Sequence, residues 1–122
     1  MVPLQVGSAT PLAVAGTAAL FALFLSLTAH LAARNVLGDV PVRSAFVVGP
    51  LPAAIAVVAA ALELPSIPAV VVAIAVDAAL VRFAYDIDRR LTVGVTAIHA
   101  VVSVILGSII FSLYVLILSA PG

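Results

Sequence analysis

The chain has 122 residues, of which 66% are hydrophobic and 8% are charged, and its mean hydropathy is +1.42. A soluble domain carries about 25% charged residues and about 45–50% apolar ones, so this composition predicts a single integral membrane domain over residues 1–122. The absence of cysteine excludes disulfides and thiolate metal sites. A net charge of zero, with no basic run, excludes nucleic acid as a partner.

The first predicted element is a membrane-spanning helix over residues 12–33, which contains no charged residue. About 20 residues at about 1.5 Å each cross a hydrocarbon core of about 30 Å, so this segment is long enough to span. Pro11 stands at its start, where a missing N–H costs nothing. The polar segment 34–43, which contains Gly38 and Pro41, predicts a loop.

The second predicted span covers residues 44–64, with Ser44 as its N-cap. Gly49, Pro50 and Pro52 lie inside it and disturb its first half, because proline removes a backbone hydrogen bond. We expect a kinked helix that still crosses the membrane. The alternative is a half-helix that begins at Pro52 and is entered by extended chain, and such a helix would cover only about 18 Å.

The third predicted span covers residues 67–85. It follows a tight turn with two prolines, in which Ser66 is available as the N-cap. The span is apolar except for Asp77 and Arg82. We expect it to cross the membrane.

The fourth predicted span covers residues 91–118, carries no formal charge and is long enough to tilt. A short charged loop over residues 86–90 precedes it. Together the four segments predict an all-α fold, a four-helix transmembrane bundle with three short connections and two short neutral tails.

Basic residues mark one side of this bundle. They lie in or beside the first and third loops: Arg34, Arg43, Arg82, Arg89 and Arg90. Because an even number of spans places these loops on the same side, the positive-inside rule makes that side cytoplasmic and puts the N- and C-termini outside. We expect the arginines to anchor a multi-pass protein of the cell membrane at its cytoplasmic interface, with i,i+4 pairs from Asp86 to Arg82 and Arg90 if helix continues there.

Asp77 is the position that says most about function. It lies ten residues after Ile67, which at about 1.5 Å per residue places it about 15 Å deep, near the bilayer midplane. A carboxylate at that depth costs several kcal/mol unless it is neutral, paired or hydrated. Ala69, Ala73 and Ala84 share its helix face, which predicts that Asp77 faces the bundle interior.

His99 is the natural partner of Asp77. If the third and fourth spans form a hairpin centred on Asp88, both residues lie eleven positions from its centre and therefore at similar depth. Polar and small residues on the fourth span recur every three or four positions and form one face, which we expect to point inward: Thr92, Thr96, His99, Ser103 and Gly107.

The pair has two interpretations. Asp77 and His99, with His30 joining from the side, would form a proton or ion relay. Alternatively, Asp77 and His99 form an interhelical hydrogen bond that sets the helix register. Metal-binding spacings such as H-x-x-x-H and E-x-x-H are absent, so the sequence predicts no metal site, no other cofactor and no catalytic residue.

Two segments carry a family resemblance, LTAHLAARNVLGDVP (27–41) and RFAYDIDRRLT (82–92). They resemble a group of small, uncharacterised four-helix membrane proteins of halophilic archaea. The resemblance covers most of the chain. It implies an archaeal multi-pass membrane protein of the same architecture, and it carries no assigned activity.

Two classes of function follow from these observations. The first is a structural or accessory membrane subunit, which packs in the lipid bilayer and associates with itself or with a larger membrane complex. Small residues at roughly heptad spacing on the first span support it: Ala15, Ala19, Ala22, Ser26, Ala29 and Ala33. The second is a small proton, ion or solute transporter or channel that uses Asp77 and His99. We expect no enzymatic activity.

Overall fold

The regular structure is entirely helical in residues 10–120, the part of the chain that a computed structural model describes. The expected neutral tails fall mainly outside these residues. Five helices follow one another along the chain: α1 (Pro11–Leu37), α2 (Val42–Val48), α3 (Pro50–Ala61), α4 (Ser66–Tyr85) and α5 (Arg89–Ser119).

Four helical segments in this part of the chain are long and apolar enough to cross a membrane. They are Pro11–Leu37, Val42–Ala61, Ser66–Tyr85 and Arg89–Ser119. The second segment consists of α2 and α3 taken together. The predicted all-α fold with four membrane-length helices is therefore confirmed, and the predicted ends differ from the observed ones by at most four residues.

The kink that joins α2 to α3 lies at Gly49. The backbone of Gly49 is helical, with φ −66° and ψ −43°, and helical hydrogen bonds continue on both sides of it. Pro50 and Pro52 have no N–H to donate, so the turn around them loses part of its hydrogen-bond ladder and bends. A kinked helical segment of membrane length is confirmed, and the alternative of a half-helix entered by extended chain is wrong.

Side-chain caps begin α1 and α5. Thr10 Oγ1 accepts a hydrogen bond from the N–H of Ala13 at 3.0 Å, and Asp88 Oδ1 accepts one from the N–H of Leu91 at 2.9 Å. Each cap satisfies one of the N–H groups that a helix N-terminus leaves without a partner. Asp88 thus sets the start of α5 two residues before the predicted Leu91.

The predicted caps at Ser44 and Ser66 are wrong. α2 begins at Val42 and α4 begins at Ser66 itself, and the residues that precede them are Pro41 and Pro65. Neither helix has a side-chain cap hydrogen bond. Proline restricts φ to about −65°, which suits the start of a helix. Pro41 and Pro65 therefore occupy the N-cap positions, and both serines lie inside their helices.

The predicted helical pairs of Asp86 with Arg82 and Arg90 are also wrong. α4 ends at Tyr85, and Asp86 takes a left-handed conformation with φ 51°. This conformation ends the helix, so positions 82, 86 and 90 do not share a helical face. All five arginines are exposed, and none of them forms a salt bridge with another residue of the described range.

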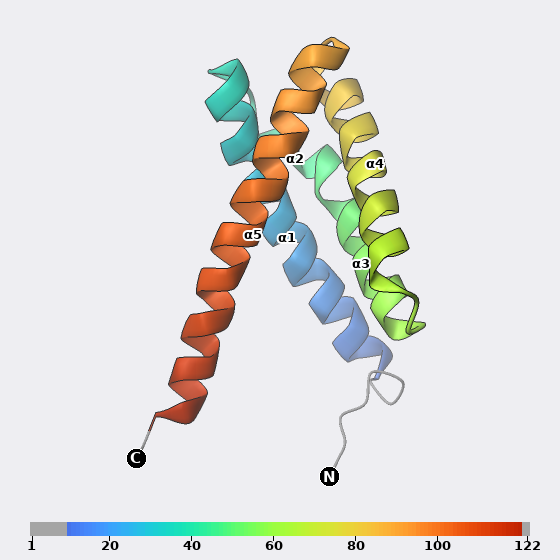
Figure 1. Cartoon of the computed structure of the whole chain (residues 1–122), viewed down its shortest axis with the longest axis vertical. Coiled ribbons are helices and arrows are strands. Elements are labelled where there is room, and N and C mark those ends of the chain that lie inside the picture. The colour runs from blue at the N-terminus through green and yellow to red at the C-terminus, as the bar shows by residue number, and fades with distance from the viewer. Residues whose placement is uncertain (1–9, 121–122) are drawn as a thin grey trace.

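The helices pack as a bundle in which α1 and α5 cross (Figure 1). α3 and α4 run beside each other, α4 also contacts α5, and α3 also contacts α1. The start of α1, the α3–α4 turn and the end of α5 lie at one end of the bundle, at the bottom of Figure 1. The α4–α5 turn and the end of α1 lie at the other, which brings the arginine-bearing segments to one end.

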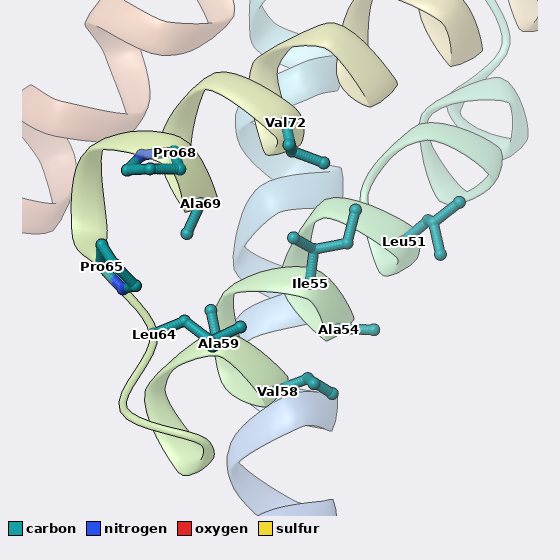
Figure 2. A pocket seen from close by; sticks show the side chains of 10 residues that line it. All are labelled: Leu51, Ala54, Ile55, Val58, Ala59, Leu64, Pro65, Pro68, Ala69 and Val72. Atoms are coloured by element: carbon teal, nitrogen blue, oxygen red, sulfur yellow. The ribbon is translucent and has the colours of Figure 1, made fainter.

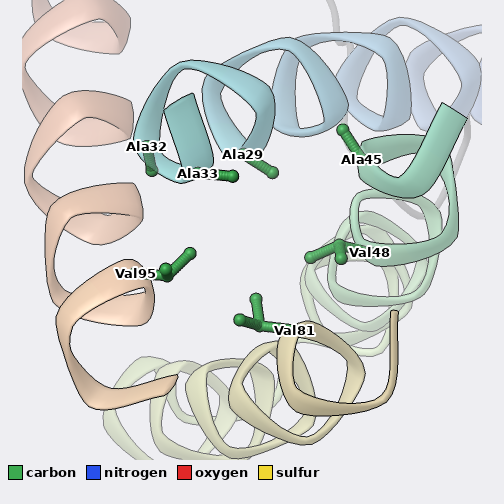
Figure 3. Close-up of a cluster of buried hydrophobic side chains, with 7 residues drawn as sticks. All are labelled: Ala29, Ala32, Ala33, Ala45, Val48, Val81 and Val95. Atoms are coloured by element: carbon green, nitrogen blue, oxygen red, sulfur yellow. The ribbon is translucent and has the colours of Figure 1, made fainter. Parts of the chain in front are cut away.

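A small apolar core closes this arginine-bearing end. Its seven side chains come from α1, α2, α4 and α5 and point toward a common centre (Figure 3), and each of them has no exposed surface: Ala29, Ala32, Ala33, Ala45, Val48, Val81 and Val95. Four of the seven are alanine, so the helices approach closely, as is typical of helix packing inside membranes.

The α2–α3 kink and α1 approach closely at Gly49 and Ser26. A Cβ atom placed on Gly49 would lie 2.7 Å from Ser26 Cα, a separation that real Cβ atoms do not show. Only glycine fits at position 49, because any side chain there would collide with the backbone of α1. The φ of Gly49, −66°, would be allowed for any residue. The sequence indicated Gly49 only as a disturbance of the second span.

Candidate functional site

A buried pair of ionisable side chains joins α4 to α5. Nδ1 of His99 lies 2.7 Å from Oδ2 of Asp77, and the two residues are only 3% and 6% exposed. It is the one ion pair between side chains of residues 10–120. The equal depth expected from a hairpin centred on Asp88 therefore brings the two groups into direct contact.

The second ring nitrogen of His99 reaches α1. Nε2 lies 3.0 Å from the carbonyl oxygen of Leu25 and 3.0 Å from Oγ1 of Thr28. The Thr28 hydroxyl donates to the Leu25 carbonyl at 3.1 Å, and the hydroxyl of Ser103 donates to Thr28 Oγ1 at 2.9 Å. One imidazole ring thus links α1, α4 and α5 in what we call the His99 network: Leu25, Thr28, Asp77, His99 and Ser103.

These partners assign the protons of the ring. A carbonyl oxygen can only accept, so the Nε2 atom that faces Leu25 must carry hydrogen. At 2.7 Å a lone pair on Nδ1 would repel a carboxylate oxygen, so one proton lies between Nδ1 and Oδ2. Whether that proton belongs to Asp77 or to His99, the pair is neutral overall. Neutrality is what a low-dielectric environment favours.

Two oxygen atoms beside the His99 network have no partner. Asp77 Oδ1 and Thr96 Oγ1 are buried and make no hydrogen bond within residues 10–120. An unsatisfied buried donor or acceptor costs about 1–3 kcal/mol, so each of these atoms lowers the stability of the fold. Other atoms of both residues line a cavity between α1, α3, α4 and α5, but the two oxygens themselves have almost no accessible surface.

His30 does not join the network. Its Nδ1 atom is buried, and it makes no hydrogen bond to any residue in the part of the chain that the structure describes. The predicted side contribution of His30 to a relay is therefore not seen in this geometry. The described residues also contain no group of three His, Cys, Asp or Glu side chains that would hold a metal ion.

The polar face predicted on the fourth span points inward. Thr92, Thr96 and His99 are buried, and Ser103 and Gly107 are half-buried. The small-residue face predicted on the first span is correct only in part. Ser26, Ala29 and Ala33 are buried, whereas Ala15 and Ala19 are exposed, because α1 and α5 diverge below their crossing (Figure 1).

Sequence reasoning missed the α1 half of the network. Leu25 contributes only a backbone oxygen, which no side-chain pattern can reveal. Thr28 is one of the few polar residues of the first predicted span, so its position in an apolar helix was the available signal. Nothing in the sequence, however, indicated that its partner would be His99, 71 positions away.

The fold and the buried pair define a class of protein: a four-helix bundle of membrane-length helices with a neutral Asp–His pair at its centre. Within that class, the chain belongs to DUF7473, a family of unknown function whose profile matches residues 8–121. No curated protein and no solved structure matches the chain.

Proposed function

We propose that the chain is a multi-pass integral membrane protein that acts as a structural or accessory subunit, and that the His99 network holds its helices in register. The observation that supports this most directly is that the imidazole of His99 contacts two other helices. Both ring nitrogens are engaged by other helices, Asp77 of α4 on one side and Leu25 and Thr28 of α1 on the other. Interhelical hydrogen bonds of this kind stabilise helix packing in lipid.

The apolar core argues against the transporter alternative. A relay through Asp77 and His99 needs a polar path to each side of the membrane. Between the pair and the arginine-bearing end lie side chains with no exposed surface, among them Ala29, Val81 and Val95. These packed apolar side chains are an obstacle to a proton or an ion moving in that direction.

An accessory role also needs a surface for partners, and the C-terminal half of α5 offers one. From Ile109 to Leu118 its large side chains are exposed, for example Ile117 at 74%. In a bilayer these side chains face lipid or the helices of another subunit. We propose a second copy or a larger membrane complex as the partner, with no catalytic reaction assigned to the chain.

The first test separates a structural pair from a relay. We expect wild type, reconstituted in vesicles, to conduct no more protons than empty vesicles at any pH from about 5 to 8, the range in which histidine titrates. Asp77→Asn should remain folded and equally silent. Thermal unfolding and proton flux are measured on the same preparations. Flux in wild type that disappears in the folded Asp77→Asn variant would contradict the structural role.

The second test concerns orientation. We propose that the arginine-bearing end is cytoplasmic, because all five arginines lie there and cytoplasmic loops carry the excess of basic residues. A reporter that functions only after export should then be active when it is fused after Gly122. A reporter that functions only in the cytoplasm should be active when it is inserted near Asp39 or Asp88. The reverse pattern at all three sites would overturn the assignment.

A further inference from the structure

The two ends of the bundle differ in charge. All five basic residues of the chain are arginines, and they lie at one end (Figure 1) together with three aspartates, Asp39, Asp86 and Asp88. Five arginines against three aspartates leave this end with a net charge of +2. The other end of the described bundle carries Glu63, in the α3–α4 turn, and no basic side chain. The excess of positive charge is therefore confined to one end.

The guanidinium groups at this end are open to the surroundings. Every arginine is exposed, and none forms a salt bridge within residues 10–120, although three aspartates lie in the neighbouring loops. Asp88 instead caps α5, where its Oδ1 atom accepts a hydrogen bond from the N–H of Leu91 at 2.9 Å. A guanidinium carries five N–H donors in a planar fork. This end thus presents donors and positive charge that the described part of the chain does not neutralise.

The arginines lie at the ends of the membrane-length helices. Arg34 and Arg82 stand in the last turns of α1 and α4. Arg43 stands in the first turn of α2, and Arg89 and Arg90 begin α5. In a protein that spans the membrane as proposed, helix ends lie where the hydrocarbon core meets the head groups. The long apolar stem of arginine lets its charged group reach outward, so the guanidinium groups lie at the depth of the lipid phosphates.

We propose that the arginine-bearing end binds the phosphate groups of anionic phospholipids. The planar fork of a guanidinium matches two phosphate oxygens at once, which makes this pairing stronger than an ordinary hydrogen bond. The phosphate of an anionic phospholipid has no cation beside it, whereas a zwitterionic head group brings its own ammonium group. The net positive charge of this end therefore favours the anionic lipid. The proposal rests on the membrane location proposed above and adds the class of lipid.

The opposite end of the bundle provides the internal control. The groove between α3 and α4 opens there, with a volume of about 630 Å³ and a lining of apolar side chains that includes Val58, Pro68 and Val72 (Figure 2). Such a surface contacts acyl chains, which anionic and zwitterionic lipids have in common. Because this end carries Glu63 and no basic side chain, it offers a phosphate no counter-charge. We expect it to show no preference between the two lipids.

The chain contains no tryptophan, so a single introduced tryptophan reports on the lipids around one position. Phe83→Trp at the arginine-bearing end and Ile67→Trp at the opposite end are matched, because both residues lie on α4 and are 78% and 79% exposed. Each variant of the full chain is reconstituted in vesicles that contain equal amounts of phosphatidylglycerol and phosphatidylcholine. One lipid or the other carries bromine on its acyl chains, and bromine quenches the fluorescence of a neighbouring tryptophan.

We expect phosphatidylglycerol to be enriched over phosphatidylcholine about fivefold at position 83, the ratio that corresponds to about 1 kcal/mol for an arginine near an anionic surface. At position 67 the ratio should be about one. Salt at about 1 M shortens the Debye length to about 3 Å and should lower the enrichment. Equal quenching by the two lipids at position 83 would overturn the proposal. No quenching by either lipid at both positions would overturn the membrane location as well.

Matched variants assign the effect to the arginines. In the Phe83→Trp chain, Arg89→Gln/Arg90→Gln removes the net charge of this end and should bring the enrichment to about one. Glu63→Gln at the opposite end should leave the enrichment unchanged. Thermal unfolding checks that each variant is folded. An unchanged enrichment in the folded double variant would overturn the proposal.

Inorganic phosphate distinguishes a lipid head group from a soluble phosphate. Millimolar inorganic phosphate, compared with chloride at the same ionic strength, should leave the enrichment at position 83 unchanged, because the lipid holds its phosphate at the depth of the guanidinium groups. Loss of the enrichment in phosphate but not in chloride would show that the arginines bind the free anion. That result would overturn the assignment to a lipid.

Discussion

His99→Leu is expected to lower the free energy of unfolding by about 3–5 kcal/mol, because several buried hydrogen bonds are lost together and each buried polar group left unpaired costs about 1–3 kcal/mol. The substitution leaves the Asp77 carboxyl without its hydrogen-bond partner, and it also removes the contacts to Leu25 and Thr28. Unfolding of the chain in detergent, followed by circular dichroism, measures the loss. A loss near 0.6 kcal/mol, the average for one interhelical hydrogen bond, would show that the His99 network does not hold the bundle together.

Asp77→Asn is the matched control for that loss. Nε2 of His99 keeps its hydrogen for Leu25, so Nδ1 can accept from the asparagine amide, and we expect a change within about 0–2 kcal/mol. Asp77→Leu leaves Nδ1 without a partner and should cost about 1–3 kcal/mol. The double variant Asp77→Leu/His99→Leu should be more stable than His99→Leu alone, because no polar group of the pair then remains buried and unpaired.

Gly49→Ala is expected to destabilise the bundle by about 3 kcal/mol or more, at or above the upper end of the usual cost of overpacking. The added methyl group would lie 2.7 Å from Ser26 Cα, and a backbone atom cannot turn aside as a flexible side chain can. The α2–α3 kink and α1 would have to separate at this contact.

Gly16→Ala provides the opposite expectation on α1. No atom lies within 4 Å of a Cβ placed there, and alanine is favoured over glycine in a helix interior by about 0.5–1 kcal/mol. We therefore expect Gly16→Ala to unfold at a slightly higher temperature than wild type and Gly49→Ala at a much lower one. Similar effects of the two substitutions would show that α1 and the kink do not pack closely.

The sequence by itself determined the helices and one of the contacts. In lipid every backbone polar group must be satisfied within its own segment, so long apolar stretches become helices whatever surrounds them. That is why the four long apolar helical segments could be placed within a few residues. The contact between Asp77 and His99 could also be predicted, because a short turn makes α4 and α5 antiparallel neighbours and equal distances from Asp88 imply equal depth.

Only the tertiary structure decided which faces of the helices meet. In water a helix shows its buried face by being apolar there, but these helices are apolar on nearly every side, and lipid is as apolar as a packed neighbour. The sequence therefore gave no sign that Leu25 and Thr28 of α1 would meet His99, or that Gly49 would lie against Ser26. Those contacts depend on how alanines and glycines let backbones approach, and the cavity beside Asp77 exists because the crossing helices diverge below that point.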